Sequence, residues 1–322
     1  MLLPGFAVAH ARQFRRFHRL ARMDPIQVLV RRGGVVEGTH VVHAVAVRDG
    51  AVVEEAGDSN RVAFLRSAAK PFQALPLVRA RDDLTTEEIA IASASHLASP
   101  EQLAAVRSLL AKAPAEEDEL ECGTAGSDSG PTSLEHNCSG KHAGMLALCR
   151  AKGWASGGYR LSTHPVQHGC LAEVASAAGV PEDEIPTAVD GCGVLTFALP
   201  LERMALMFAR LEQVDGGARV AAAMRAHPEL VRGPMAADSL LMSELEGWTA
   251  KGGAEGLLCA AGPGGLGIAL KVEDGSMRAM RPALAELLRR LGLETGDLGV
   301  EPLENSLGEV VGEIVSDMSR AG

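Results

Sequence analysis

The sequence is poor in aromatic residues, which make up 3% of its 322 residues. It holds no apolar run of 18 or more residues, the length that a membrane-spanning helix needs, so we expect no membrane partner. The formal net charge is −10, and no cluster of lysines and arginines is interleaved with aromatics. This excludes a nucleic-acid partner. The six cysteines form no Cys-x-x-Cys pair, and their wide spacing excludes a zinc-finger framework.

Acids are missing from the first 22 residues, which contain five arginines. The short apolar start precedes these arginines, the reverse of the order in a secretory signal. We interpret residues 1–23 as a basic, disordered N-terminal extension, with Met23 as the true initiator and a transit-like leader as the alternative. Without a signal the protein is expected to be cytoplasmic, where cysteines are free thiols or metal ligands rather than disulfides.

Hydrophobic residues make up 47% of the chain and glycine occurs 36 times, enough for a large core of small side chains. Residues 24–322 show no repeat or linker and are predicted to form one domain. Strand-like runs lie near both ends, so we expect an α/β (α+β) fold with a sheet built from both chain ends and a helical region between. The expected strands are 27–31, 40–48, 51–54, 256–260 and 267–272, and the expected helices are 71–80, 85–95, 100–112, 142–152, 165–178, 196–213, 217–227 and 282–293.

One short motif places a serine and a lysine three residues apart, Ser67 and Lys70, directly after a strand-like run. Positions i and i+3 share a face of one helical turn, so the hydroxyl and the amine can meet. A lysine made neutral by burial can take the serine proton and create a nucleophile. Acyl-transfer enzymes that work without a histidine use this Ser-x-x-Lys arrangement. Pro71 favours the start of a helix here; the structural alternative is a helix cap beside a surface lysine.

A second motif repeats this spacing with a thiol, in Cys138 and Lys141, and Cys192 follows between two glycines. Two thiolates and one nitrogen suit a zinc ion with an open coordination position. Either Lys141 or His142 can supply the nitrogen, and the spacing does not choose between them. The structural alternative is a capped helix start that contains a cysteine by chance.

Taken together, these motifs resemble the asparaginase II family, the zinc-containing L-asparaginases typified by a rhizobial inducible enzyme. The resemblance runs from about residue 26 to 315 and implies a catalytic domain over 24–322, a serine β-lactamase/glutaminase-like fold and a homodimer. The segments that carry it are 66–76, 94–96, 122–123, 137–145, 164–165, 190–193, 251–256 and 269–275.

The resemblance also implies roles for individual residues. Ser67 with Lys70 would be the primary nucleophile and base, and Ser95 with Lys271 a second catalytic pair. After Ser95 the chain departs from the usual family pattern, which leaves Ser99 as an alternative second serine. The implied zinc ligands are Cys138, Lys141 and Cys192, and the residues that would bind substrate are Arg66 and Asp190.

The expected activity is hydrolysis of L-asparagine to L-aspartate and ammonia through an acyl-enzyme beside a Zn²⁺ site. A glutaminase, or another serine–lysine amidohydrolase of the β-lactamase-like group, would share the same motifs. A β-lactamase or peptidase would share the serine pair but has no need of the Cys-x-x-Lys motif. A non-catalytic zinc or thiol sensor would need the thiols and no serine pair.

Overall fold

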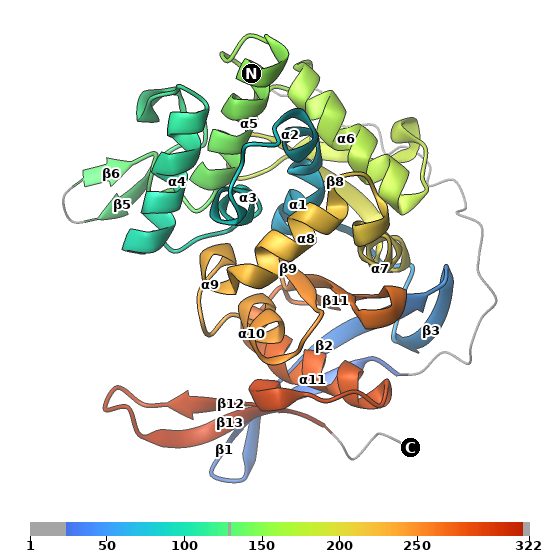
Figure 1. Ribbon diagram of the computed structural model, residues 1–322. Helices are drawn as coiled ribbons and strands as arrows, with labels where there is room; N and C mark the ends of the chain where they lie inside the picture. The colour runs from blue at the N-terminus through green and yellow to red at the C-terminus, as the bar shows by residue number, and fades with distance from the viewer. Residues whose placement is uncertain (1–23, 128–129, 318–322) are drawn as a thin grey trace, which may run out of the picture.

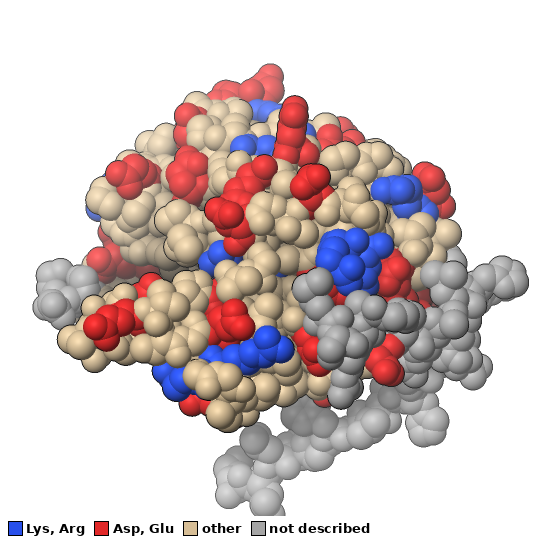
Figure 2. Space-filling view, turned by 90° about the horizontal axis from the view of Figure 1, so that it is seen from below, with Lys and Arg blue, Asp and Glu red and all other residues tan. Residues whose placement is uncertain are grey.

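The structure is a computed structural model that describes residues 24–127 and 130–317. The predicted N-terminal extension and the alternative start at Met23 lie outside the described residues. In the described part of the chain, no helix combines the length and apolar composition that crossing a bilayer requires. Acidic side chains are spread over the face seen from below, with fewer basic groups between them (Figure 2), as the net charge of −10 leads one to expect.

An antiparallel sheet drawn from both ends of the chain forms the lower half of the molecule (Figure 1). Its order is β12-β13-β1-β2-β11-β10-β9, and β3 pairs with the second half of β2. The bounds are β1 (Ile26–Arg32), β2 (Val35–Arg48), β3 (Ala51–Ala56), β9 (Thr249–Gly253), β10 (Leu257–Gly262), β11 (Leu266–Val272), β12 (Val300–Glu304) and β13 (Val310–Ser316).

The helical region between these ends sits above the sheet (Figure 1). Helix α7 (Leu201–Ala209) packs across β2, β10 and β11, and α11 (Met280–Arg290) packs against β1, β11 and β13. The other helices are α1 (Lys70–Gln73), α2 (Leu75–Ala80), α3 (Thr86–Ala92), α4 (Pro100–Lys112), α5 (Ser139–Lys152), α6 (Pro165–Ala178), α8 (Gly217–Ala226), α9 (Pro228–Val231) and α10 (Ala237–Glu244).

Gly267 shows why α7 can lie so close to the sheet. A Cβ at this position would stand 2.0 Å from the carbonyl oxygen of Ala205 in α7, so a larger residue would force the two layers apart. Strand alternation puts Thr249, Ala261 and Gly267 on this face, because they are paired across β9, β10 and β11. Lys251, two residues after Thr249, therefore also points toward the helical region.

The expected α/β (α+β) fold, with a sheet built from both chain ends and a helical region between, is confirmed. Helix α6 has the predicted bounds, and α4, with its Ser99 capping box, also matches. The predicted helix 196–213 is wrong in its first part. Residues Leu195–Pro200 form strand β8, and α7 starts only after Pro200. A short buried strand reads as a continuous apolar run, which periodicity alone does not separate from a helix.

Five short strands connect loops of the helical region. Strand β4 (Val62–Phe64) pairs with β8, which also pairs with β7 (Thr187–Val189), and β5 (Ala125–Ser127) pairs with β6 (Gly130–Thr132). Because β4 leads directly into the turn that carries Ser67, its pairing with β8 fixes the start of that turn.

Candidate active site

Ser67 lies in a short 3-10 turn, Arg66–Ala69, that runs directly into α1. The backbone N–H of Lys70 donates to the carbonyl oxygen of Ser67, so the two residues share one helical turn, as the spacing predicts. Ser67 is half-buried, whereas Lys70 is completely buried. In the described residues no side-chain hydrogen bond joins the two, and the amine of Lys70 points elsewhere.

The turn is held in a strained conformation. Arg66 has φ of +49°, in the left-handed region that a residue with a side chain rarely adopts. Its N–H donates to the Thr196 hydroxyl at 3.0 Å, and the Leu65 N–H donates to the Phe197 carbonyl at 2.8 Å. Such strain persists only where surrounding structure enforces it, and it collects at functional sites.

Lys70 reaches the second serine rather than the first. Its Nζ donates to the Ser95 hydroxyl at 2.9 Å and to the Ala94 carbonyl. Burial lowers the pKa of Lys70 from its usual 10.5, although the nearby Cys138 thiolate opposes that shift. A lysine held in this way is more readily neutral and able to accept a proton.

The segment that carries Ser95 is fixed from both sides. The Ser95 N–H donates to the Val231 carbonyl at 2.7 Å, and the His96 N–H donates to the Asn137 carbonyl at 3.2 Å. Burial lowers the pKa of His96 to about 4, so this ring is neutral. Its Nε2 lies 2.8 Å from the hydroxyl of Ser139, the first residue of α5.

Ser99, the alternative second serine, has another role. Its hydroxyl accepts from the Gln102 N–H as the cap of α4 and donates to Glu101 at 2.9 Å. In the described residues it makes no bond to Lys70. The geometry therefore brings Ser95, not Ser99, to the buried lysine.

The Cys-x-x-Lys motif lies beside the serine pair. Lys141 Nζ donates to Cys192 Sγ at 3.0 Å, and a hydrogen bond from the Cys192 thiol keeps the pKa of Cys138 well below its usual value. Burial alone would lower the pKa of Lys141, but the Cys138 and Cys192 sulfurs raise it. Because the Cys138 sulfur and the Lys141 amine also shift the pKa of Lys70, the two motifs form one electrostatic cluster.

The structure separates the two nitrogens that the sequence left open. Lys141 contacts Cys192, whereas His142 Nδ1 lies 2.8 Å from the Tyr159 hydroxyl. The Tyr159 hydroxyl also accepts from the Glu121 N–H at 2.7 Å. The imidazole is thereby held away from the cysteines.

The two predicted substrate-binding residues form an ion pair. Arg66 Nε donates to Asp190 Oδ1 at 2.6 Å, and the same carboxylate accepts from the Gly191 N–H at 2.7 Å. Arg66 is also 4.0 Å from the exposed carboxylate of Glu255. The guanidinium therefore sits between two acids at the rim of the serine turn.

Lys271, predicted to pair with Ser95, lies elsewhere. It is a half-buried residue of β11 between Leu257 and His43, and its Nζ donates to the Val272 carbonyl. No hydrogen bond connects it to Ser95 in the described part of the chain. Burial lowers its pKa, and its charged neighbours are Arg61, Glu255, Asp274 and Glu273 rather than any residue of the serine cluster.

A different lysine, Lys251, lies at the cluster and was missed by sequence reasoning. It is fully buried in β9, and its Nζ donates to the Gly252 carbonyl at 2.9 Å and to Asp238 at 3.3 Å. Burial lowers its pKa to about 8, with Lys70 contributing to the decrease. The available signal was the glycine pair after Lys251, since glycines inside a strand mark a close backbone approach.

The close backbone approach is between β9 and the turn that carries Ser67. A Cβ on Gly253 would stand 2.6 Å from the Leu65 carbonyl oxygen, so only glycine lets β9 lie against the turn that carries Ser67. Lys251 and Gly253 are two residues apart in a strand and point to the same face. The strand thus delivers Lys251 to the side on which Lys70 lies.

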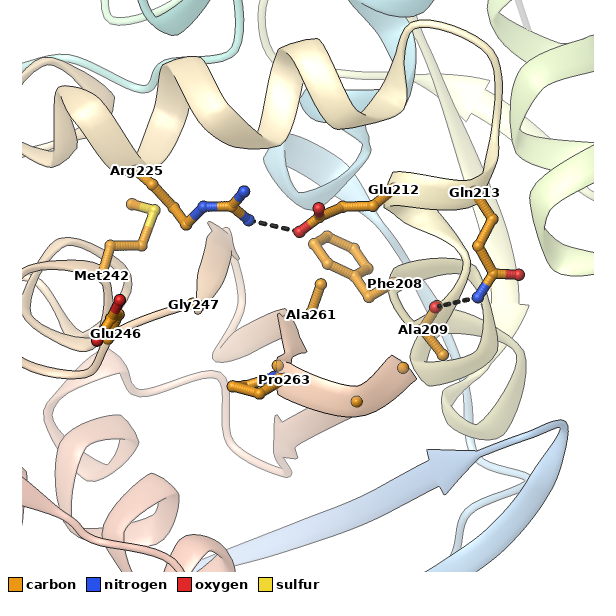
Figure 3. Close-up of a pocket in the computed structure, with 13 residues that line it drawn as sticks. Phe208, Ala209, Glu212, Gln213, Arg225, Met242, Glu246, Gly247, Ala261 and Pro263 are labelled. Atoms are coloured by element: carbon orange, nitrogen blue, oxygen red, sulfur yellow. Dashed lines mark hydrogen bonds and ion pairs between the residues drawn. The ribbon is translucent and has the colours of Figure 1, made fainter.

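A separate cavity of about 690 Å³ opens at the turn between β10 and β11 (Figure 3). Arg225 on its wall donates to Glu212 at 2.5 Å and to the Thr249 hydroxyl at 3.0 Å. None of the site residues discussed above lines this cavity. Its size therefore does not identify the place of the chemistry.

Comparison with known proteins identifies the chain's family. A family model described as L-asparaginase II matches residues 28–316, whereas none of the curated proteins matches the chain. Similar solved structures include native Mglu, 16% identical with a TM-score of 0.45, over 81% of this chain and 69% of that chain. Native Mglu in the presence of 4.3 M NaCl is 16% identical with a TM-score of 0.47, over 82% of this chain and 65% of that chain. A probable glutaminase from Bacillus subtilis complexed with 6-diazo-5-oxo-L-norleucine is 14% identical with a TM-score of 0.36, over 79% of this chain and 84% of that chain.

The family match covers nearly all of the described residues, including both lysine-bearing turns and β9. Members of this family are hydrolases that act on amides, so the cluster of buried lysines and serines belongs to an enzyme. The protein is a member of the L-asparaginase II family and an amidohydrolase.

Proposed function

We propose that the enzyme hydrolyses L-asparagine to L-aspartate and ammonia through an acyl-enzyme on Ser67. The observation that carries the proposal is the buried Lys70, with a lowered pKa, held on the same turn as Ser67 and 2.9 Å from the Ser95 hydroxyl. Amide cleavage needs an activated nucleophile and a donor for the departing amine. This group of three residues contains both.

In the first step the Ser67 oxygen attacks the carboxamide carbon and its proton passes to neutral Lys70. The C–N bond then breaks, and the proton returns from Lys70 to the leaving ammonia through the Ser95 hydroxyl, which already accepts from Lys70. Water attacks the resulting ester with the same groups taking its proton, and L-aspartate leaves as Ser67 regains its hydrogen. Backbone N–H groups at the start of the helix would hold the oxyanion.

Lys251 is our candidate for the second lysine, in place of Lys271. Lys70 lowers the pKa of the neighbouring Lys251, and a positive charge at Lys251 would favour negative charge that develops on the substrate. Its carboxylate partner Asp238 is 2% exposed, so the pair is screened little by solvent. Arg66 and Asp190 remain the residues proposed to bind the charged ends of the substrate.

The donor set fits a zinc ion. The sulfur atoms of Cys138 and Cys192 and the amine of Lys141 lie next to one another. No group of three or more His, Cys, Asp and Glu side chains suited to a metal occurs in the described residues, so a site here depends on the lysine. Bound zinc would supply a Lewis-acidic centre for holding a polar substrate group, while Ser67 and Lys70 need no metal-bound water for acyl transfer.

Ammonia release by the purified protein tests the proposal. We expect turnover of L-asparagine, with Ser67→Ala abolishing it and the exposed control Ser162→Ala leaving it unchanged. A faster rate with L-glutamine would make the enzyme a glutaminase with the same mechanism, and unchanged turnover in Ser67→Ala would remove the nucleophile assignment. A cytoplasmic homodimer remains our proposal for its state in the cell, and size-exclusion chromatography with light scattering tests the dimer.

A further inference from the structure

A small pocket of about 260 Å³ lies behind the free edge of β9. It is formed by the connection between α9 and α10, the start of α11 and one residue of β12, elements that meet in the lower half of Figure 1. Three arginines line it: Arg232, Arg278 and Arg281. Two acids, Asp238 and Glu301, complete its charged groups.

Among the described residues, Arg232 and Arg281 retain donors that no protein group uses. Arg232 makes no side-chain hydrogen bond or ion pair within 24–127 and 130–317, and its Nη1 lies 3.8 Å from the place of a Cβ on Gly252. Arg281 is 8% exposed and donates Nη2 to the Asp297 carbonyl, but its buried Nε has no partner in the described structure. Arg278 uses its Nε on His40.

The two acids do not neutralise this charge. Asp238 is engaged by the Lys251 amine and by the Gly252 N–H at 2.8 Å. Glu301 forms no ion pair within 4.0 Å in the described part of the chain, and burial raises its pKa. Because Asp238 already balances Lys251, the three arginines outnumber the remaining acid, Glu301, and the pocket keeps a surplus of positive charge.

The pocket is separate from the serine cluster but next to it. Lys251 and Gly252 are consecutive in β9, so their Cβ directions point to opposite faces of the strand. Lys251 faces Lys70, and a Cβ on Gly252 would face Asp238 and Arg232. Asp238 therefore lies at the edge of β9, near groups on both of its faces.

We propose that this pocket binds a small doubly charged oxyanion, with phosphate and dicarboxylates as the two sources of that chemistry. Arginine forks bind phosphate and carboxylate oxygens through paired hydrogen bonds, and the volume suits a ligand of a few heavy atoms. An anion beside Arg232 would offset the charge that this guanidinium exerts on Lys251 and Asp238. The anion concentration would thus change the electrostatic environment of the buried Lys251 amine.

Isothermal titration calorimetry of the full chain with inorganic phosphate, and separately with succinate, tests the proposal. We expect saturable binding of at least one anion at one site per chain. Arg232→Gln should weaken it about tenfold or more, the loss of a charged hydrogen bond. The control Arg107→Gln, on the exposed face of α4, should leave the affinity unchanged.

Each outcome decides the question. Binding of phosphate alone or of succinate alone supports the site and identifies its ligand. If Arg232→Gln fails to fold, Arg278→Gln, at an exposed position, provides the same test. Absence of binding by both anions, or equal affinity in the arginine variant that folds, overturns the proposal. So does loss of anion binding when Ser67→Ala protein is saturated with L-asparagine, because the anion would then occupy the substrate site.

Discussion

Lys70 and Lys141 occupy turns of the same design. Each follows a nucleophilic side chain by three residues, Ser67 in one case and Cys138 in the other, and both amines are buried. Their pKa values nevertheless move in opposite directions. Burial dominates at Lys70 and lowers its pKa, whereas the two sulfurs beside Lys141 outweigh burial and raise its pKa.

The comparison shows that neighbours, rather than depth, determine what a buried lysine does. Lys70 donates to a hydroxyl and a carbonyl, and the neighbouring Lys141 amine opposes the support that the Cys138 sulfur gives to its positive charge. Lys141 faces a thiol–thiolate pair, which gives much support to one. We propose that the first environment makes Lys70 a base. In the second, a metal ion would replace the proton that Lys141 holds.

The largest effect on activity is expected from replacing Lys70, the proposed base. Lys70→Met keeps a similar volume without the charge, so the fold should survive while kcat falls about a thousandfold through loss of proton transfer. Steady-state kinetics and thermal unfolding check the two halves of this prediction. The exposed control Lys152→Met should change neither, and a Lys70→Met enzyme with normal kcat would show that another group is the base.

The next largest effect on activity is expected from replacing Ser95, the hydrogen-bond partner of Lys70. Ser95→Ala removes the hydroxyl that accepts from Lys70, and we expect kcat to fall about a hundredfold as the proton relay is lost. Ser99→Ala removes only the cap of α4 and should cost about 1 kcal/mol of unfolding free energy with kcat unchanged. Denaturant melts and kinetics of the pair measure both. The reverse pattern would assign the second serine role to Ser99.

The cysteine-bearing turn should behave differently from the serine-bearing one. Cys192→Ala removes one of three proposed metal donors, so zinc content should fall and KM should rise about tenfold or more, with a smaller change in kcat. Elemental analysis and kinetics of protein purified without chelator report these quantities. Full activity in wild-type protein that contains no zinc would remove the metal from the mechanism.

The pH profile separates the lysines with lowered pKa values. Activity should rise with pH as Lys70 loses its proton, since the neutral amine is the base, and this limb should lie below pH 10.5. It should fall again above about pH 8 as Lys251 loses its charge. Asp238 raises the pKa of Lys251, so Asp238→Asn should move the falling limb to lower pH. An unmoved limb would show that Lys251 does not control it.

The sequence predicted the parts of the molecule that are local. The two turns, the capped helix α4 and the sheet from both chain ends follow from spacing, caps and strand runs. The spacing left Lys141 and His142 open, and the contact that separates them is the one between the His142 imidazole and the Tyr159 hydroxyl. The proposed role of Lys251 also depends on distant contacts, since β9 comes near Lys70 through strand pairing and the close approach of Gly253 to Leu65.

The covalent intermediate on Ser67 tests the central claim most directly. Protein mixed with L-asparagine, quenched in acid during turnover and digested, can be analysed by mass spectrometry for the peptide that contains Ser67. The account predicts an aspartyl ester on that peptide, absent from Ser67→Ala and accumulating in Ser95→Ala if breakdown of the ester is slowed. An aspartyl adduct on another residue, or turnover of L-asparagine by Ser67→Ala at the wild-type rate, would contradict it.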